Sequence, residues 1–194
     1  MASLFIFGLG YTSQAVARTA MAQGFTVAGT CRSPKKCNIL KEQGIEAFEF
    51  DNIPPDILTN YTHILSSIPP QENGDIVLPF LPTTNKWLGY FSTTGVYGDY
   101  AGKWVDEQTA PRPDNYRLRK RLEAEKQWQE RGGHIFRLAG IYGKGRSAID
   151  DVLSGQARRI YKEGQVFSRI HVDDIAQTIL ASMSRPNKQA IYNV

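Results

Sequence analysis

The sequence has few of the residues that hold small domains together covalently or through a metal. It contains 2 cysteines and 3 histidines among 194 residues. Cys31 and Cys37 form no CxxC motif and have no histidine nearby, so we expect two reduced thiols and no metal site. A chain of this length buries roughly 70% of its extended surface on folding and needs no such staple. A disulfide-rich secreted scaffold is therefore excluded.

Long apolar runs and a strong net charge are also lacking. No segment approaches the roughly 18 consecutive apolar residues of a membrane helix, and the apolar opening 1–9 has neither a basic start nor a small-residue cleavage site. The net charge is only +4, and the basic run 117–121 is followed by Glu123 and Glu125. This pattern favours a solvated or site-lining helix face over a nucleic-acid surface. We expect a cytoplasmic protein with no membrane or nucleic-acid partner.

Short apolar runs alternate with helical patterns along the chain, which predicts a parallel sheet with crossover helices. Proline and glycine at 34 and 44 bound the second helix, and Asp114 is the expected N-cap of the third. The expected strands are 3–7, 25–30, 45–50, 63–68, 87–92, 134–138 and 190–194, with a further segment at 165–170. The expected helices are 12–23, 34–43, 115–130 and 172–184.

A glycine-rich turn follows the first expected strand and opens the first helix. Gly8, Gly10 and Ser13 occupy the three small positions of a GxGxxG-type sequence, with Tyr11 and Thr12 between them. The first glycine allows the tight turn, the second allows a pyrophosphate to approach the backbone, and the third small residue lets helix and strand pack closely. Free N–H groups at the helix N-terminus attract phosphates. Within a βαβ unit the turn predicts dinucleotide binding. The alternatives are an S-adenosylmethionine site and a turn that only packs the helix.

The residues after the second strand bear on which dinucleotide would bind. Arg32 stands where NAD-binding proteins carry an acidic residue, and Lys35 and Lys36 follow it. A guanidinium can bind a 2′-phosphate bidentately, so we expect NADP as the cofactor, with NAD less favoured. The alternative is an exposed loop arginine. Asp51 is a candidate for an adenine contact or a turn residue, and Ser67 is a further cofactor-binding candidate.

Four segments resemble a known family, the extended short-chain dehydrogenases/reductases of the NAD(P)-dependent epimerase/dehydratase group. They are YFSTTGVYGD at 90–99, WVDE at 104–107, RLAGIYG at 137–143 and SRIHVDDIA at 168–176. The resemblance implies an α/β fold with a Rossmann-type doubly wound parallel sheet. It implies a single NAD(P)-binding domain over 1–194, with 143–170 contributing to a small, incomplete C-terminal substrate lobe. Family members continue beyond the segment matched by 190–194, so a truncated or reduced relative is one expectation.

In that family a Ser/Thr hydroxyl and the Tyr and Lys of a Y-x-x-x-K motif carry the chemistry. The matching positions here are Thr93, Tyr116 and Lys120. The resemblance then implies an oxidoreductase or epimerase/dehydratase in which Tyr116 and Lys120 move the proton and Thr93 binds the reacting oxygen. The substrate would be a small molecule such as a sugar nucleotide or another anion.

A rival register places arginines in the two catalytic positions. The small residue and glutamate that usually follow the family lysine stand three and four residues after Arg121, which puts Arg117 and Arg121 where Tyr and Lys belong. At 100° per residue these arginines share the apolar face of the helix, whereas Tyr116 and Lys120 lie on the opposite side. Arginine stays protonated and is no base. This alternative describes a non-catalytic NAD(P)-binding protein, a sensor or a ligand-binding protein.

The loop after the sixth expected strand offers two further cations. Lys144 and Arg146 follow the strand end, where this kind of fold binds ligands, and are either anion contacts or solvated loop residues. The expected partners are a small-molecule substrate and, as an open alternative to a monomer, a second copy of the chain in a homodimer.

Overall fold

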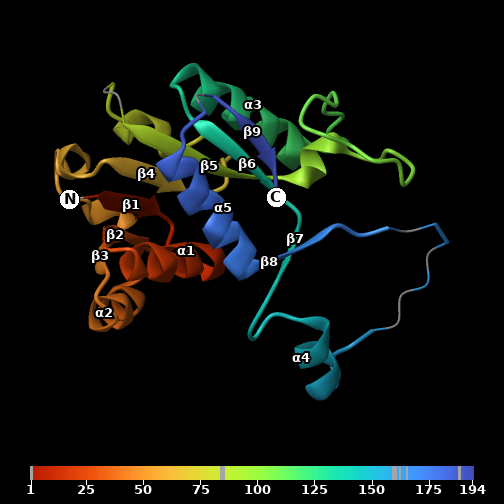
Figure 1. The fold of residues 1–194 in the computed structure, drawn as a ribbon, viewed down its shortest axis with the longest axis horizontal. Coiled ribbons are helices and arrows are strands. Elements are labelled where there is room, and N and C mark those ends of the chain that lie inside the picture. The colour runs from red at the N-terminus through yellow and green to blue at the C-terminus, as the bar shows by residue number, and fades with distance from the viewer. Residues whose placement is uncertain (1, 84–85, 159–160, 162, 165, 188) are drawn as a thin grey trace.

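The computed structural model describes residues 2–83, 86–158, 161, 163–164, 166–187 and 189–194. Its centre is a seven-stranded sheet in the order β3-β2-β1-β4-β5-β6-β9, and every neighbouring pair is parallel (Figure 1). The strand order reverses between β1 and β4, which confirms the predicted Rossmann-type doubly wound sheet. The strands are β1 (Ser3–Phe7), β2 (Thr26–Cys31), β3 (Glu46–Glu49), β4 (His63–Ser66), β5 (Trp87–Thr93), β6 (His134–Leu138) and β9 (Ile191–Asn193).

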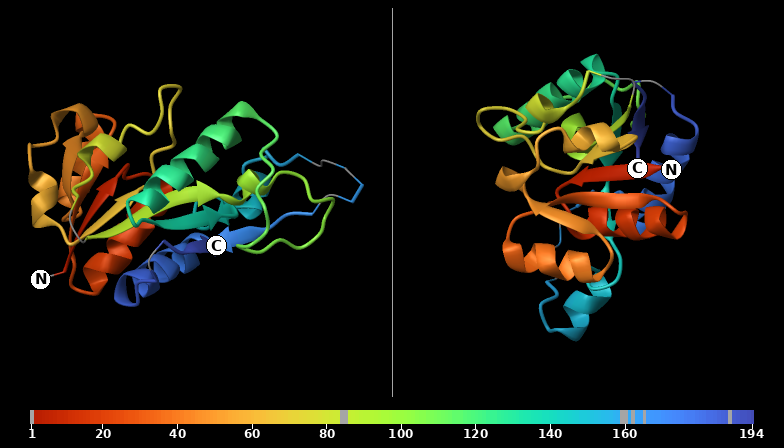
Figure 2. Two further views of the ribbon diagram at one scale, coloured as in Figure 1. Left: turned by 90° about the horizontal axis from the view of Figure 1, so that it is seen from above. Right: turned by 90° about the vertical axis from the view of Figure 1, so that its left-hand side faces the viewer.

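Helices cover both faces of the sheet. Figure 2 shows α3 (Tyr116–Glu130) on one side and α1 (Tyr11–Ala22) and α5 (Val172–Ser184) on the other. The buried Cys37 and Leu40 of α2 (Pro34–Glu42) belong to the same core cluster as α1 and α5. Single-turn 3-10 segments lie in the connections at Phe50–Asn52, Ile57–Asn60, Leu78–Phe80 and Thr94–Tyr97.

The central position of β1 in the sheet explains why its sequence is apolar throughout. All five of its residues are buried, because a parallel strand inside a doubly wound sheet is covered on both faces. Leu4 and Ile6 point into the core cluster beneath α1, α2 and α5. Phe5 and Phe7 point into the second cluster, which includes Trp128 of α3.

The start of α3 differs from the prediction by one residue. The N-cap is Asn115, whose side chain accepts a hydrogen bond from Leu118 N at 3.0 Å. Asn115 has an extended backbone (φ −133°, ψ 165°), which aims its side chain back at the first turn. The prediction that Asp114 caps the helix is therefore wrong. The Asp114 carboxylate instead accepts a hydrogen bond from the Asn115 amide.

The segment between β6 and α5 leaves the main sheet. It contains β7 (Gly140–Tyr142), α4 (Ala148–Leu153) and β8 (Arg169–His171), and β7 pairs with β8 in a second, two-stranded parallel sheet. Figure 1 shows α4 projecting from the body of the molecule. β8 overlaps the segment expected at 165–170, of which residue 165 lies outside the described residues. β7 and α4 were not predicted, since runs this short give little periodicity.

The two cysteines are paired in the structure. Cys31 ends β2 and Cys37 lies in the second turn of α2, which brings their Cα atoms to 5.8 Å and joins the sulfurs in a disulfide. That Cα separation falls within the range disulfides span. The prediction of two reduced thiols is therefore wrong, because the βα turn folds back over six residues and brings the two side chains together.

Candidate cofactor site

A pocket of about 230 Å³ lies at the carboxyl-terminal edge of the sheet. Doubly wound folds bind ligands at this edge, outside the point where the strand order reverses. Residues of α1, β5, α3, β6 and β7 line it, together with single residues that follow β1, β4 and β7. The lining residues are Gly10, Tyr11, Thr12, Ser13, Ser67, Phe91, Ser92, Arg121, Leu138, Ile141 and Arg146. The fold thus brings Ser67, predicted separately, next to the glycine turn.

Gly8 holds the glycine turn in its tight geometry. Its φ is +87°, and a Cβ there would lie 2.8 Å from Ser67 Oγ. Gly8 N donates to Thr30 Oγ1 at 2.8 Å, and Ser67 Oγ donates to Gly8 O at 2.6 Å. The turn is therefore fixed from both neighbouring strands.

Two features of the turn fit a pyrophosphate. A Cβ on Gly10 would meet nothing within 4 Å, so the backbone faces open space there. Ser13 is fully buried, lines the pocket, and has no hydrogen-bond partner for its Oγ within the described part of the chain. Buried hydroxyls are normally paired. The helix N-terminus adds free N–H groups and partial positive charge, which complete a cradle for phosphate oxygens.

The two residues expected to contact the adenosine half lie outside this pocket. Arg32 is exposed and directly follows β2. Ser33 next to it caps α2 by accepting a hydrogen bond from Lys36 N, and Lys36 Nζ donates to Gln14 Oε1 of α1 at 3.2 Å. Asp51 is exposed in the 3-10 turn after β3.

The structure brings only one of the four helix candidates to the pocket. Arg121 lines it, and its Nη1 donates to Phe91 O at 2.9 Å and Tyr90 Oη at 3.1 Å. Arg117 and Tyr116 are exposed, Tyr116 by 52%, and neither lines the pocket. Lys120 also lies outside it, with its Nζ 3.1 Å from Glu123 Oε2. Helical periodicity correctly places Arg121 on the face of α3 that meets the sheet, whereas Arg117, predicted on the same face, is exposed.

The hydroxyl residue that lines the pocket at the end of β5 is also not the one that the family pattern predicts. Thr93 Oγ1 accepts a hydrogen bond from Gly95 N at 3.1 Å and caps the 3-10 turn, and Thr93 does not line the pocket. Its neighbour Ser92 does line it. Successive side chains of a strand point to opposite faces, so Ser92 lies on the side of α3. Sequence reasoning missed Ser92, although it is the first residue of the S-[ST] pair.

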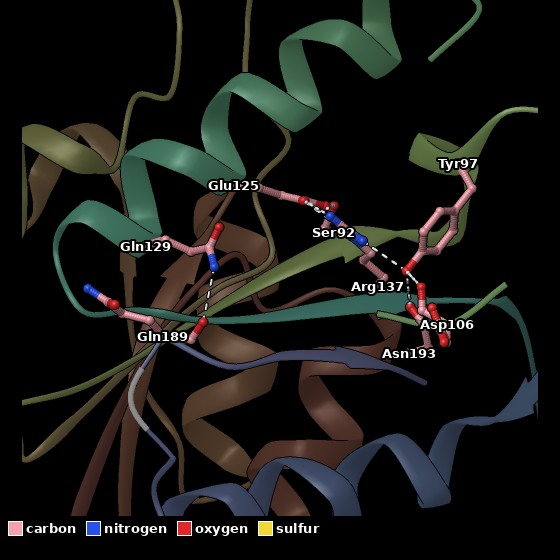
Figure 3. A network of polar contacts seen from close by, with 8 residues as sticks. All are labelled: Ser92, Tyr97, Asp106, Glu125, Gln129, Arg137, Gln189 and Asn193. Carbon is pink, nitrogen blue, oxygen red and sulfur yellow. Dashed lines mark hydrogen bonds and ion pairs between the residues drawn. The ribbon is translucent and has the colours of Figure 1, made fainter. Parts of the chain in front are cut away.

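A buried polar network lies behind Ser92 (Figure 3). Ser92 Oγ donates to Glu125 Oε1 at 2.5 Å. Arg137 of β6 holds the same carboxylate bidentately, with Nε 3.1 Å from Oε1 and Nη2 2.7 Å from Oε2. Arg137 Nη1 donates to Tyr97 Oη at 2.8 Å, and that hydroxyl lies 2.8 Å from Asn193 Oδ1 of β9. Burial alone would lower the pKa of Arg137, but hydrogen bonds with Glu125 and Tyr97 and their charges raise it.

The pocket carries positive charge. Neither Arg121 nor Arg146 belongs to an ion pair within the described residues. The Arg146 guanidinium lies 5.6 Å from the centre of the Tyr11 ring, and Tyr11 Oη donates to Lys144 O at 3.2 Å. Two guanidinium groups without a carboxylate at a ligand-binding edge favour an anionic ligand.

The described residues contain no group of three or more His, Cys, Asp or Glu side chains able to hold a metal ion. None of their helices has both the length and the apolar character needed to cross a bilayer.

The strand order and the pocket define a protein of the Rossmann-type nucleotide-binding class. No protein-family model and no curated protein matches the sequence. Solved structures do match it over its whole length. A conserved protein of unknown function from Silicibacter pomeroyi DSS is 44% identical, with a TM-score of 0.90, and the chain covers 72% of it.

Two further structures share the fold at lower identity. A putative NAD-dependent epimerase/dehydratase from Methylobacillus flagellatus is 23% identical, with a TM-score of 0.70, and 75% of its chain is covered. UDP-glucose 4-epimerase from Bifidobacterium longum, solved with NAD+ and UDP, is 14% identical, with a TM-score of 0.72, and 78% is covered. All of this chain is matched in both. The chain belongs to the family of the Silicibacter protein, and it shares its fold with the epimerase/dehydratase structures.

Proposed function

We propose that this protein binds NADP(H) in the pocket described above and acts on a small anionic substrate. The single observation that carries the proposal is the pocket itself, which joins an open glycine turn and an unpaired buried hydroxyl to the Arg121 guanidinium. The first two features suit a pyrophosphate, and the guanidinium suits the far end of the ligand.

The residues predicted from the sequence would each bind a different part of the cofactor. The N–H groups that open α1 and the Ser13 hydroxyl would hold the pyrophosphate, with Gly10 leaving room for it. Arg32 would bind the 2′-phosphate, Asp51 would lie near the adenine, and Ser67 would complete the pocket wall beside the turn. When bound, the nicotinamide would supply or accept a hydride.

The substrate is proposed to be an anion that reaches the cofactor from the side of the 143–170 segment. Arg121 and Arg146 would neutralise it. The Bifidobacterium enzyme is a UDP-glucose 4-epimerase, so a nucleotide sugar is the first class to test. The reaction would be a hydride transfer of the oxidoreductase or epimerase/dehydratase type.

One observation favours the second candidate, a non-catalytic NADP(H)-binding protein that senses or stores a ligand. Among the lining residues, Tyr11 is the only one besides the arginines with an acidic or basic side chain, and Tyr116 and Lys120 do not line the pocket. The described pocket therefore has no Tyr–Lys pair to move a proton.

A titration with NADPH and NADH tests the cofactor proposal. NADPH is expected to bind at least about 10-fold more tightly, which corresponds to about 1.4 kcal/mol. Arg32→Asp should bring the two affinities close together. Arg119→Asp makes the same charge change at an exposed residue outside the pocket and should leave the ratio intact. Equal affinities in the unmodified protein, or an unchanged ratio in Arg32→Asp, would contradict the proposal.

An activity assay distinguishes the two candidate functions, the enzyme and the non-catalytic binding protein. The protein is mixed with NADP+ and UDP-glucose or UDP-glucuronate, and NADPH formation and sugar products are followed. Product formation supports the enzyme. Tight cofactor binding without any product supports the binding protein.

A further inference from the structure

We propose that Ser92 and Arg121 together recognise the carboxamide of the cofactor's nicotinamide ring. The inference rests on the proposed function, because it assigns one part of the same pocket. It concerns two residues that belong to neither the predicted Tyr–Lys pair nor the glycine turn.

Ser92 presents only a hydrogen-bond acceptor to the pocket. A serine hydroxyl has one proton to donate and two lone pairs to accept with. Ser92 Oγ lies 2.5 Å from Glu125 Oε1, and the same carboxylate is held by Arg137 through two nitrogens. A carboxylate in a guanidinium fork accepts hydrogen bonds and has none to donate. The Ser92 proton is therefore committed to Glu125, and a lone pair remains for a ligand.

Burial keeps the direction of the hydrogen bond from Ser92 to Glu125 fixed. Ser92 is 5% exposed and Glu125 is 1% exposed, so water does not compete for the hydrogen bond. Glu125 and Arg137 act here as positioning residues, because they fix the orientation of the Ser92 hydroxyl without lining the pocket themselves.

Arg121 presents only hydrogen-bond donors. Its Nη1 is bound to Phe91 O and Tyr90 Oη, which anchors the guanidinium against β5. Nε and Nη2 make no hydrogen bond within the described residues and remain free to donate. Because Phe91 directly precedes Ser92, the anchored donor and the fixed acceptor stand at neighbouring residues of the same strand.

A primary carboxamide complements this pair. Its carbonyl oxygen accepts from Arg121 and its NH2 group donates to Ser92. A methyl ketone of the same size and charge keeps the first contact and loses the second, which leaves the buried lone pair of Ser92 without a partner. Sites built to pair a polar group discriminate against ligands that lack it.

The experiment compares NADP+ with its 3-acetylpyridine analogue, in which CH3 replaces the carboxamide NH2. The unmodified protein is expected to bind NADP+ about 10-fold more tightly than the analogue. Ser92→Ala should bring the two dissociation constants within about two-fold of each other. Ser182→Ala, an equally buried serine of α5 at 5% exposure, should retain the full discrimination.

Two further probes separate the inference from the proposed function. Adenosine 2′,5′-bisphosphate lacks the nicotinamide half and should bind Ser92→Ala as it binds the unmodified protein, which also reports that the variant folds. Glu125→Gln can donate from its own amide to Ser92 Oγ and turn the serine proton toward the pocket, so discrimination should fall there too.

The outcomes are distinct. If neither NADP+ nor the analogue binds, the proposed function fails and the inference fails with it. If both bind equally well to the unmodified protein, or if Ser92→Ala keeps the 10-fold preference, only the carboxamide assignment is overturned.

Discussion

Glu125 of α3 and Arg137 of β6 form a fully buried, bidentate ion pair, with Arg137 Nη2 2.7 Å from Glu125 Oε2. The pair joins the helix to the sheet directly behind the pocket. Ser92 on one side donates a further hydrogen bond to Glu125, and Tyr97 on the other side accepts one from Arg137. Such a pair adds little over a well-packed apolar contact, but removing one partner leaves a buried charge alone.

Glu125→Ala is expected to lower the free energy of unfolding by about 3–5 kcal/mol, because Arg137 would lose its counter-charge in the interior. Glu123→Ala is the matched control on the same helix. Glu123 pairs with Lys120 at the surface, its side chain is 56% exposed, and its loss should cost less than about 1 kcal/mol. Urea unfolding of both variants provides the measurement. Equal destabilisation would contradict the assigned role of the buried pair.

Gly8 and Gly10 should respond differently to the same substitution. Gly10→Ala has space for its Cβ and φ of −81°, so the melting temperature should change little. NADPH affinity should fall by about 10-fold or more, since the methyl group occupies the place of the pyrophosphate. Gly8→Ala forces a positive φ and a contact with Ser67 Oγ, which should reduce stability itself by at least about 1 kcal/mol. Thermal melting and NADPH titration are compared. Unimpaired NADPH binding in Gly10→Ala would argue against the site.

Two alignments of α3 with the family motif are possible, one with Tyr116 and Lys120 at the catalytic positions and one with arginines there. They predict opposite effects of substitutions on NADPH affinity. Arg121→Ala should raise the dissociation constant of NADPH by about 10-fold, because the residue lines the pocket and makes charge-assisted contacts. Tyr116→Phe and Lys120→Ala should leave it within about two-fold, because both side chains lie outside the pocket. Isothermal titration of the three variants checks this. A selective effect of Tyr116→Phe would restore the literal Y-x-x-x-K motif.

Stability should fall as the pH drops below neutral, in part through His134. Its Nδ1 lies 3.0 Å from Leu88 O, so that nitrogen carries the proton, and its buried Nε2 has no partner in the described residues. Burial lowers the pKa of His134, and the hydrogen bond to Leu88 only partly opposes this. The unfolded state therefore takes up a proton at higher pH than the folded state. The stabilisation is complete above about pH 6.5 and is lost as the pH falls toward the folded pKa.

Melting temperatures between pH 5 and 7.5 measure this effect. His134→Phe keeps a ring to stack on Trp87 and removes the titrating group, so its melting temperature should depend less on pH. The pKa of His63 is also lowered by burial, which leaves a residual slope. If the melting temperature of His134→Phe depends on pH as steeply as that of the unmodified protein, the pH effect arises from other residues.

The sequence by itself determined the fold. The alternation of strands and helices, the apolar β1 and the glycine turn with its strand before and helix after specify a parallel doubly wound sheet, because each feature depends only on local periodicity and backbone sterics. Helical periodicity also indicated that Arg121, and not Lys120, faces the sheet.

Only the tertiary structure decided which polar groups meet. Ser92 and Thr93 are neighbours in the sequence, but their side chains point to opposite faces of the strand. Ser92 therefore lines the pocket, whereas Thr93 caps a turn. Glu125 is separated from Arg137 by the end of a helix and the start of a strand, and Cys31 is joined to Cys37 by the turn into α2. These pairings depend on how whole elements pack against one another, since a hydrogen bond requires its two atoms within about 3 Å and no local pattern fixes that distance.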